Sequence, residues 1–108
     1  MLYIVATPIG NIEDASERMK RILSSVDFIL CEDTRRSHKL LQMLSLQAPH
    51  LISCHAHNEQ ARVDRAISEL QSGKVGAYIS DAGMPAISDP GMRLVQAAHH
   101  FSIPVVPI

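Results

Sequence analysis

The strongest indication of chemistry in this chain is residues 80–91, a polar segment that reads Ser-Asp-Ala-Gly-Met-Pro-Ala-Ile-Ser-Asp-Pro-Gly. Its two Asp present carboxylates, and its two Gly and two Pro fix the shape of the backbone. The short apolar run of residues 75–79 precedes it, and an amphipathic stretch follows. A connection that only joins a strand to a helix needs about three or four residues, whereas this segment has about twice that number of Asp, Gly and Pro residues alone. The segment therefore belongs at the carboxyl end of a buried strand, where open α/β sheets bind ligands.

Three further polar clusters also follow apolar runs. They are residues 7–11 (Thr-Pro-Ile-Gly-Asn), 32–35 (Glu-Asp-Thr-Arg) and 55–58 (His-Ala-His-Asn). In a parallel sheet, the segments that follow the strands all project from one edge. We therefore expect a single crevice at that edge, lined by Pro8, Asp33, His55 and Asp81.

Five apolar runs predict buried strands, at residues 2–6, 26–31, 51–54, 75–79 and 103–106. Stretches with the apolar spacing of helices separate them. Strands that alternate with helices over short connections are typical of the α/β class. The sequence thus predicts an open, mainly parallel five-stranded sheet with helices on both faces.

Capping residues indicate where the helices begin and end. Asp14 or Ser16 can cap the first helix, and Asn58 stands where it can cap the helix expected over residues 58–72. Gly73 occupies the position of a left-handed C-terminal cap.

The last helix is expected to begin at Asp89 and Pro90, because Asp caps helices well and Pro fits the first turn. Its inward-facing residues are expected to be Leu94, Val95, Ala98 and Phe101. No internal repeat, linker or low-complexity stretch divides the chain.

Length and composition fit one folded domain, since the chain has 108 residues, of which 46% are hydrophobic and 19% charged. The formal net charge of −1 argues against a domain that binds nucleic acid through overall charge, although it leaves room for local basic patches. Residues 2–6 run directly into Pro8 without a basic stretch, so they are interpreted as neither a signal peptide nor a membrane span. We expect a cytoplasmic protein in which Cys31 and Cys54 are buried free thiols.

Two other kinds of site fit the clusters less well. Residues 7–11 contain one Gly and a Pro, whereas a dinucleotide-binding turn needs several glycines. His55 and His57 are metal-ligand types, but alternate residues of an extended segment point to opposite faces. No metal is expected, and these histidines are interpreted as hydrogen-bonding side chains of a polar cleft.

A run of cations opens the second helix: Arg35, Arg36, His38 and Lys39. Cations at a helix start oppose the helix dipole. Two interpretations stay open, a solvated helix face and a group that holds a phosphate-bearing substrate.

Taken together, the clusters resemble the ribosomal RNA small-subunit methyltransferase I family, a branch of the tetrapyrrole methylase superfamily. The resemblance covers the whole chain in order. Its motifs are L-Y-I-V-A-T-P-I-G-N at residues 2–11, C-E-D-T-R at 31–35, H-x-H-N-E at 55–59 and S-D-A-G-x-P-x-I-S-D-P-G at 80–91. The chain departs from the family pattern at Met84, where Thr is expected, and at Ala86, where Gly is expected.

The resemblance implies a two-domain enzyme, usually a homodimer, whose cofactor S-adenosylmethionine lies between the domains. The implied reaction is methylation of the ribose 2′-hydroxyl of a cytidine in the decoding region of small-subunit (16S) ribosomal RNA. Residues 1–108 match the first domain, and the last expected strand has no following helix to cover it. We therefore expect an N-terminal half whose partners are small-subunit RNA and a second copy, with neither a membrane nor DNA involved.

A ribose hydroxyl is a poor nucleophile, so this reaction needs alignment and help with proton removal. The candidate proton acceptors are Asp33, His55 and Asp81, and the sequence does not rank them. The resemblance implies cofactor contacts from Pro8, Ile9, Asp81, Ala82, Gly83 and Met84. It implies substrate contacts from Arg35, His57 and Asn58.

Two alternative functions stay open. A methylase of a small tetrapyrrole-like ring would share the fold and cofactor, but that branch typically shows G-x-G-x-G-D in the first loop and G-D-P in place of S-D-A-G. A non-catalytic module that docks on RNA or dimerises would bind no cofactor.

Overall fold

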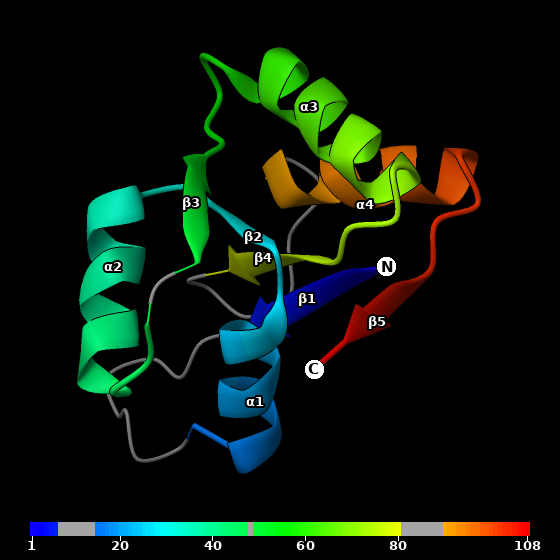
Figure 1. Ribbon diagram of the computed structural model, residues 1–108. Coiled ribbons are helices and arrows are strands. Elements are labelled where there is room, and N and C mark those ends of the chain that lie inside the picture. Colours follow the sequence, from blue (N-terminus) through cyan, green and yellow to red (C-terminus); the bar gives the residue numbers. More distant parts are fainter. Residues whose placement is uncertain (7–14, 48, 81–89) are drawn as a thin grey trace.

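The computed structural model describes residues 1–6, 15–47, 49–80 and 90–108 of the chain. Strands and helices alternate along it (Figure 1). The strands are β1 (Leu2–Ala6), β2 (Phe28–Cys31), β3 (His50–Ser53), β4 (Gly76–Ser80) and β5 (Val105–Pro107). The helices are α1 (Glu17–Ser25), α2 (Thr34–Met43), α3 (Glu59–Gln71) and α4 (Pro90–His100). None of the helices in the described ranges is long and apolar enough to cross a membrane.

The strands form one five-stranded sheet in the order β3-β2-β4-β1-β5. Every pair of neighbours is parallel, so the predicted sheet is confirmed, and it is wholly rather than mainly parallel. The central strand β4 is buried along its whole length, as a strand covered on both faces should be. Its neighbour β1 pairs with it from Leu2 opposite Gly76 to Ala6 opposite Ser80.

Two separate apolar cores cover the two faces of the sheet. On one face, α3 and α4 pack through the side chains Val63, Ala66, Ile67, Leu70, Leu94 and Ala98. On the other face, α1 and α2 pack through Met19, Ile22, Leu23 and Leu41. The sequence prediction of helices on both faces is therefore confirmed.

The helices that follow neighbouring strands lie on alternate faces. Along the order β3-β2-β4-β1, the following helices are α3, α2, α4 and α1, which belong in turn to one core and then the other. The helices that follow adjacent strands therefore lie on opposite faces of the sheet. In open α/β sheets, such points are where crevices form at the carboxyl edge.

Two of the predicted helix boundaries are confirmed. The Ser16 hydroxyl caps α1 by accepting a hydrogen bond from the Met19 N–H at 3.0 Å, while Asp14 lies outside the described residues. Gly73 follows α3 with φ of 98°, a left-handed conformation that strains any residue with a Cβ.

The expectation that Phe101 faces inward is wrong, because its side chain is 49% exposed. Helix α4 ends at His100, and Ser102 takes a left-handed φ of 57° that turns the chain toward β5. Phe101 therefore lies beyond the end of the helix that buries Leu94 and Ala98. Asp89, the expected cap of this helix, lies outside the described residues.

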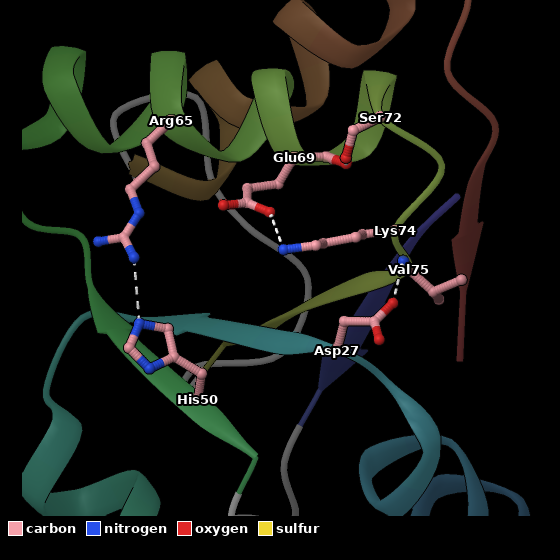
Figure 2. A network of polar contacts seen from close by, with 7 residues as sticks. All are labelled: Asp27, His50, Arg65, Glu69, Ser72, Lys74 and Val75. Atoms are coloured by element: carbon pink, nitrogen blue, oxygen red, sulfur yellow. Dashed lines mark hydrogen bonds and ion pairs between the residues drawn. The ribbon is translucent and has the colours of Figure 1, made fainter.

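Polar contacts join the segments at the amino edge of the sheet (Figure 2). The Asp27 carboxylate, just before β2, accepts a hydrogen bond from the Val75 N–H, just before β4, at 2.8 Å. The Asp27 N–H in turn donates to the Val75 carbonyl at 2.7 Å. Beside them Lys74 pairs with Glu69 at 2.6 Å, and an Arg65 nitrogen lies 3.2 Å from His50 Nε2. These contacts fix the relative position of β2 and β4 where the two strands begin.

Removing the Asp27 carboxylate is expected to weaken the contact between the beginnings of β2 and β4 and so to destabilise the fold. In an Asp27→Ala variant, the exposed Val75 N–H loses its protein acceptor to water, which should lower the free energy of unfolding by about 0.5–1.5 kcal/mol. Asp27→Asn keeps an acceptor oxygen and should retain most of the stability. Urea denaturation of both variants checks this, and equal stability of Asp27→Ala and the original chain would contradict it.

Candidate active site

Two of the four polar clusters lie within the described residues, and both stand at the carboxyl edge of the sheet. Asp33 follows β2 and His55 follows β3, and these strands are neighbours with Cys31 opposite Ser53. The backbone continues this pairing one residue further, since the Cys54 N–H donates to the Cys31 carbonyl at 2.8 Å.

The other two clusters, residues 7–11 and 80–91, lie outside the described residues apart from Ser80, Pro90 and Gly91. They include all of the expected cofactor contacts: Pro8, Ile9, Asp81, Ala82, Gly83 and Met84. The strands before them are described, however, and β1 and β4 are neighbours whose last residues, Ala6 and Ser80, lie opposite each other. Ala6 and Ser80, the described residues that precede these clusters' undescribed parts, therefore lie side by side at the same edge as Asp33 and His55.

Asp33 is the N-terminal cap of α2. One carboxylate oxygen accepts hydrogen bonds from the Arg35 N–H at 3.0 Å and the Arg36 N–H at 3.4 Å. The other oxygen has no hydrogen-bond partner among the described residues, and the side chain is exposed. Asp33 thus has a structural task with one oxygen and is able to accept a proton with the other.

Asn58 precedes α3 but does not cap it through its side chain, contrary to expectation. Its amide oxygen accepts a hydrogen bond from the His55 N–H at 2.8 Å, and its amide nitrogen lies 3.3 Å from the Ser53 carbonyl. The side chain is drawn back toward the end of β3, so it holds the turn that carries His55 instead of the helix start.

Both ring nitrogens of His55 lie near N–H donors. Nδ1 accepts from the His57 N–H at 3.2 Å, and Nε2 lies 3.2 Å from the amide nitrogen of Asn58. A neutral imidazole has one acceptor nitrogen, so only one of these two contacts is a hydrogen bond in a given tautomer. The ring is therefore oriented by its own turn, and a proton delivered to it must displace one of these donors.

His57 and Arg35 are the expected substrate contacts that face solvent most fully. The His57 ring meets the His55 ring edge-on, with centroids 5.8 Å apart. Arg35 lies in the first turn of α2, two residues from Asp33. Among the described residues no group of three or more His, Cys, Asp or Glu side chains is arranged to hold a metal ion.

Two contacts at this edge carry no local sequence signal. Arg93 in the first turn of α4 pairs with Glu59, the first residue of α3, at 3.0 Å. The second contact is between Gly91 and Tyr78, where a Cβ on the glycine would overlap the tyrosine ring. Both hold the start of α4 against its surroundings, and so fix one end of the segment that begins at Asp81.

Cys54 immediately precedes His55 in the sequence, and its side chain is fully buried. Burial raises the pKa of its thiol from 9.0 to about 11, and the nearby Glu59 carboxylate adds to the rise. Both cysteines are free and buried, as the sequence predicts. A thiol with a raised pKa is a poor nucleophile, so Cys54 serves as packing.

Comparison with known proteins places the chain in a family. Residues 1–107 match the tetrapyrrole (corrin/porphyrin) methylases, and the chain belongs to this family. The fold agrees: the uroporphyrin-III C-methyltransferase of Thermus thermophilus superposes with a TM-score of 0.70 at 20% identity, over 99% of this chain and 46% of that one.

Closer relatives carry the name ribosomal RNA small subunit methyltransferase I. The chain is 50% identical over 107 residues to that of Pseudomonas aeruginosa and 50% identical over 107 residues to that of Halalkalibacterium halodurans. It is 45% identical over 107 residues to the one from Escherichia coli O157:H7. In each case 99% of this chain is covered, but it spans only 37–38% of the relative's length.

The raised pKa of Cys54 predicts a loss of stability at alkaline pH. Between pH 9.0 and about 11 the unfolded thiol is ionised while the folded thiol keeps its proton. The folded state then binds more protons, so this contribution is complete below pH 9.0 and falls as pH rises toward 11. A Cys54→Ala variant should therefore lose less stability than the original chain between pH 8 and 10.5, measured by urea denaturation. If the free energy of unfolding falls equally with pH in both proteins, the buried thiol does not contribute to the pH dependence of stability.

Proposed function

We propose that this chain is the N-terminal half of an S-adenosylmethionine-dependent methyltransferase of small-subunit ribosomal RNA, acting on a cytidine ribose 2′-hydroxyl. The observation that carries the proposal is the identity of 44–50% over the whole chain to relatives named for methylation of this RNA. The joint position of the polar segments at one edge of the sheet supports it.

The cofactor would be held by the segments that follow β1 and β4. These segments contain Pro8, Ile9, Asp81, Ala82, Gly83 and Met84. Two facts favour them: their strands are neighbours in register, and the following helices pack on opposite faces. When bound, S-adenosylmethionine supplies an electrophilic methyl group.

Proton removal from the ribose hydroxyl would fall to Asp33, His55 or Asp81. Asp33 offers an exposed carboxylate oxygen that the described helix cap does not use. His55 offers a ring whose orientation is fixed by Asn58 and His57. Because oriented acceptors avoid the entropy of alignment, either arrangement suits general base catalysis.

Substrate contacts would come from Arg35 and His57, which are exposed beside these acceptors. Asn58 is better suited to support His55, since both ends of its amide already have partners within the chain. We further propose that the active protein has a second domain, forms a homodimer and works in the cytoplasm. A test with a tetrapyrrole ring and with small ribosomal subunits as methyl acceptors distinguishes the two branches of the family.

Variants of the full-length protein test the assigned roles. Asp81→Ala should mainly weaken cofactor binding, measured by calorimetry. His55→Ala or Asp33→Ala should lower turnover by roughly 10²–10⁴, the usual worth of a proton acceptor, and leave cofactor affinity nearly unchanged.

Asp33 needs a matched control, because its loss also removes a helix cap worth about 0.5–2 kcal/mol. Asp33→Ser and Asp33→Asn keep a capping oxygen but lack the carboxylate. Turnover that falls equally in Ala, Ser and Asn variants assigns the role to the carboxylate. Full activity in the Ser and Asn variants would reduce Asp33 to a cap, and unchanged methylation in both the Asp33 and His55 series would remove both residues from proton transfer.

The chain of residues 1–108 tested by itself should fold, bind S-adenosylmethionine weakly or not at all, and methylate nothing. One domain provides one wall of the proposed pocket, and each 1.4 kcal/mol of lost contact is tenfold in affinity. Calorimetry and methyl transfer to small ribosomal subunits check this. Methyl transfer by residues 1–108 with purified components would refute the two-domain proposal.

A further inference from the structure

The cations of this chain are divided unevenly between the two faces of the sheet. Six of the ten Lys and Arg residues lie on α1 and α2, namely Arg18, Lys20, Arg21, Arg35, Arg36 and Lys39. These two helices contain one acidic residue, Glu17. Helices α3 and α4 carry three arginines against three acids. The overall charge of −1 therefore hides a basic face.

Ion pairing increases the difference in charge between the two faces. Toward α3 and α4, Arg93 pairs with Glu59 and Lys74 with Glu69. On α1 and α2, Lys20 pairs with Glu17 at 3.2 Å. Within the described part of the chain, Arg18, Arg21, Arg35 and Lys39 have no acidic side chain within ion-pair distance, and all four are exposed.

These four cations form two pairs, each on one side of its helix. Arg18 and Arg21 are three residues apart, and Arg35 and Lys39 are four apart, so each pair stands about one helical turn apart. Both helices pack on the same face of the sheet through one apolar core. A hollow of about 520 Å³ lies between α1 and the segment after α2, and it is lined by Glu17, Lys20, Arg21, Ser24 and Leu46.

Helix stability does not account for two of these four positions. Arg18 and Arg35 lie in the first turns of their helices, where a cation opposes the helix dipole. A polyanion is the ligand that such an arrangement favours. Helices α1 and α2 contain no Phe, Tyr or Trp, and their one aromatic ring is that of His38, so charge rather than base stacking dominates this face.

We propose that the exposed face of α1 and α2 binds the phosphate backbone of the RNA substrate, through Arg18, Arg21, Arg35 and Lys39. The inference rests on the proposed function, because it takes RNA as the substrate. Arg35 connects this face to Asp33 at the carboxyl edge, so bound RNA runs from the basic face to the site. Contacts of this kind position an RNA without reading its sequence.

The test compares two triple variants of the full-length protein with the same net charge. One is Arg18→Gln, Arg21→Gln, Lys39→Gln, and the other is Arg65→Gln, Lys74→Gln, Arg93→Gln on the opposite side. Arg35 is left intact, so the proposed site is unchanged. The probes are a labelled hairpin from the decoding region of 16S RNA and a scrambled RNA of equal length, titrated from 50 to 200 mM salt.

We expect the first variant to bind both RNAs about tenfold or more weakly at 50 mM salt. Its plot of log affinity against log salt should be less steep by about 2, since each lost phosphate contact accounts for roughly 0.7. The second variant should bind both RNAs like the original protein. The comparison uses RNA binding and not turnover, because Arg93 supports the start of α4. Arg18→Lys, Arg21→Lys, Lys39→Arg should restore binding.

Equal effects of the two triple variants, or no effect of the first, would overturn the proposal. So would vesicles of anionic lipid that compete with RNA at equal phosphate concentration. Should the first triple variant unfold, its three single variants are each expected to lose part of the affinity, and no loss in any of them rejects the proposal. Cofactor binding, measured in parallel, separates these outcomes from failure of the proposed function, since a methyltransferase with another acceptor would keep it.

Discussion

The parallel pairing of β1 with β4 is the constraint on which the rest of the molecule depends. It aligns Ala6 with Ser80, and so brings the starts of two polar segments together although the sequence separates them widely. Because β4 also pairs with β2, the same register extends to Asp33 and, through β3, to His55. The Asp27–Val75 contacts at the opposite edge fix where β2 and β4 begin, and thereby where both end.

The two faces of the sheet differ in charge. The α3 and α4 side is balanced in charge, and its ion pair between Glu59 and Arg93 supports the edge where chemistry is proposed. The α1 and α2 side keeps several cations unpaired by described residues. Net charge alone conceals such a division, because acids on one face cancel cations on the other.

The fold could be predicted from the sequence because each strand contains a short apolar run, although β3 also includes the polar residues His50 and Ser53. Boundaries shifted where one residue type serves two structures. Val26 is apolar and buried, yet it caps the end of α1 instead of starting β2. Phe101 keeps the helical spacing but lies beyond the helix end, which a left-handed Ser102 sets without any glycine to signal it.

The candidate site was predictable only as far as residue types and strand polarity reach. Asp33 and His55 were placed at one edge by that reasoning, but their hydrogen bonds were not. Asn58 is an equally good helix cap and turn former, and only the three-dimensional structure shows that it holds His55. The pairing of Glu59 with Arg93 links two helices far apart in the sequence, so no local pattern indicates it.

The position of β1 in the sheet also determines how long this strand stays unpaired while the chain is being synthesised. β1 is made before both of its partners, because its central partner begins at Gly76 and its other partner at Val105. At 5–20 residues per second, β1 waits roughly 4–15 s before β4 is even polymerised. Through that interval β1 lacks both of its partners, so its apolar residues are exposed to non-native contacts until β4 is made.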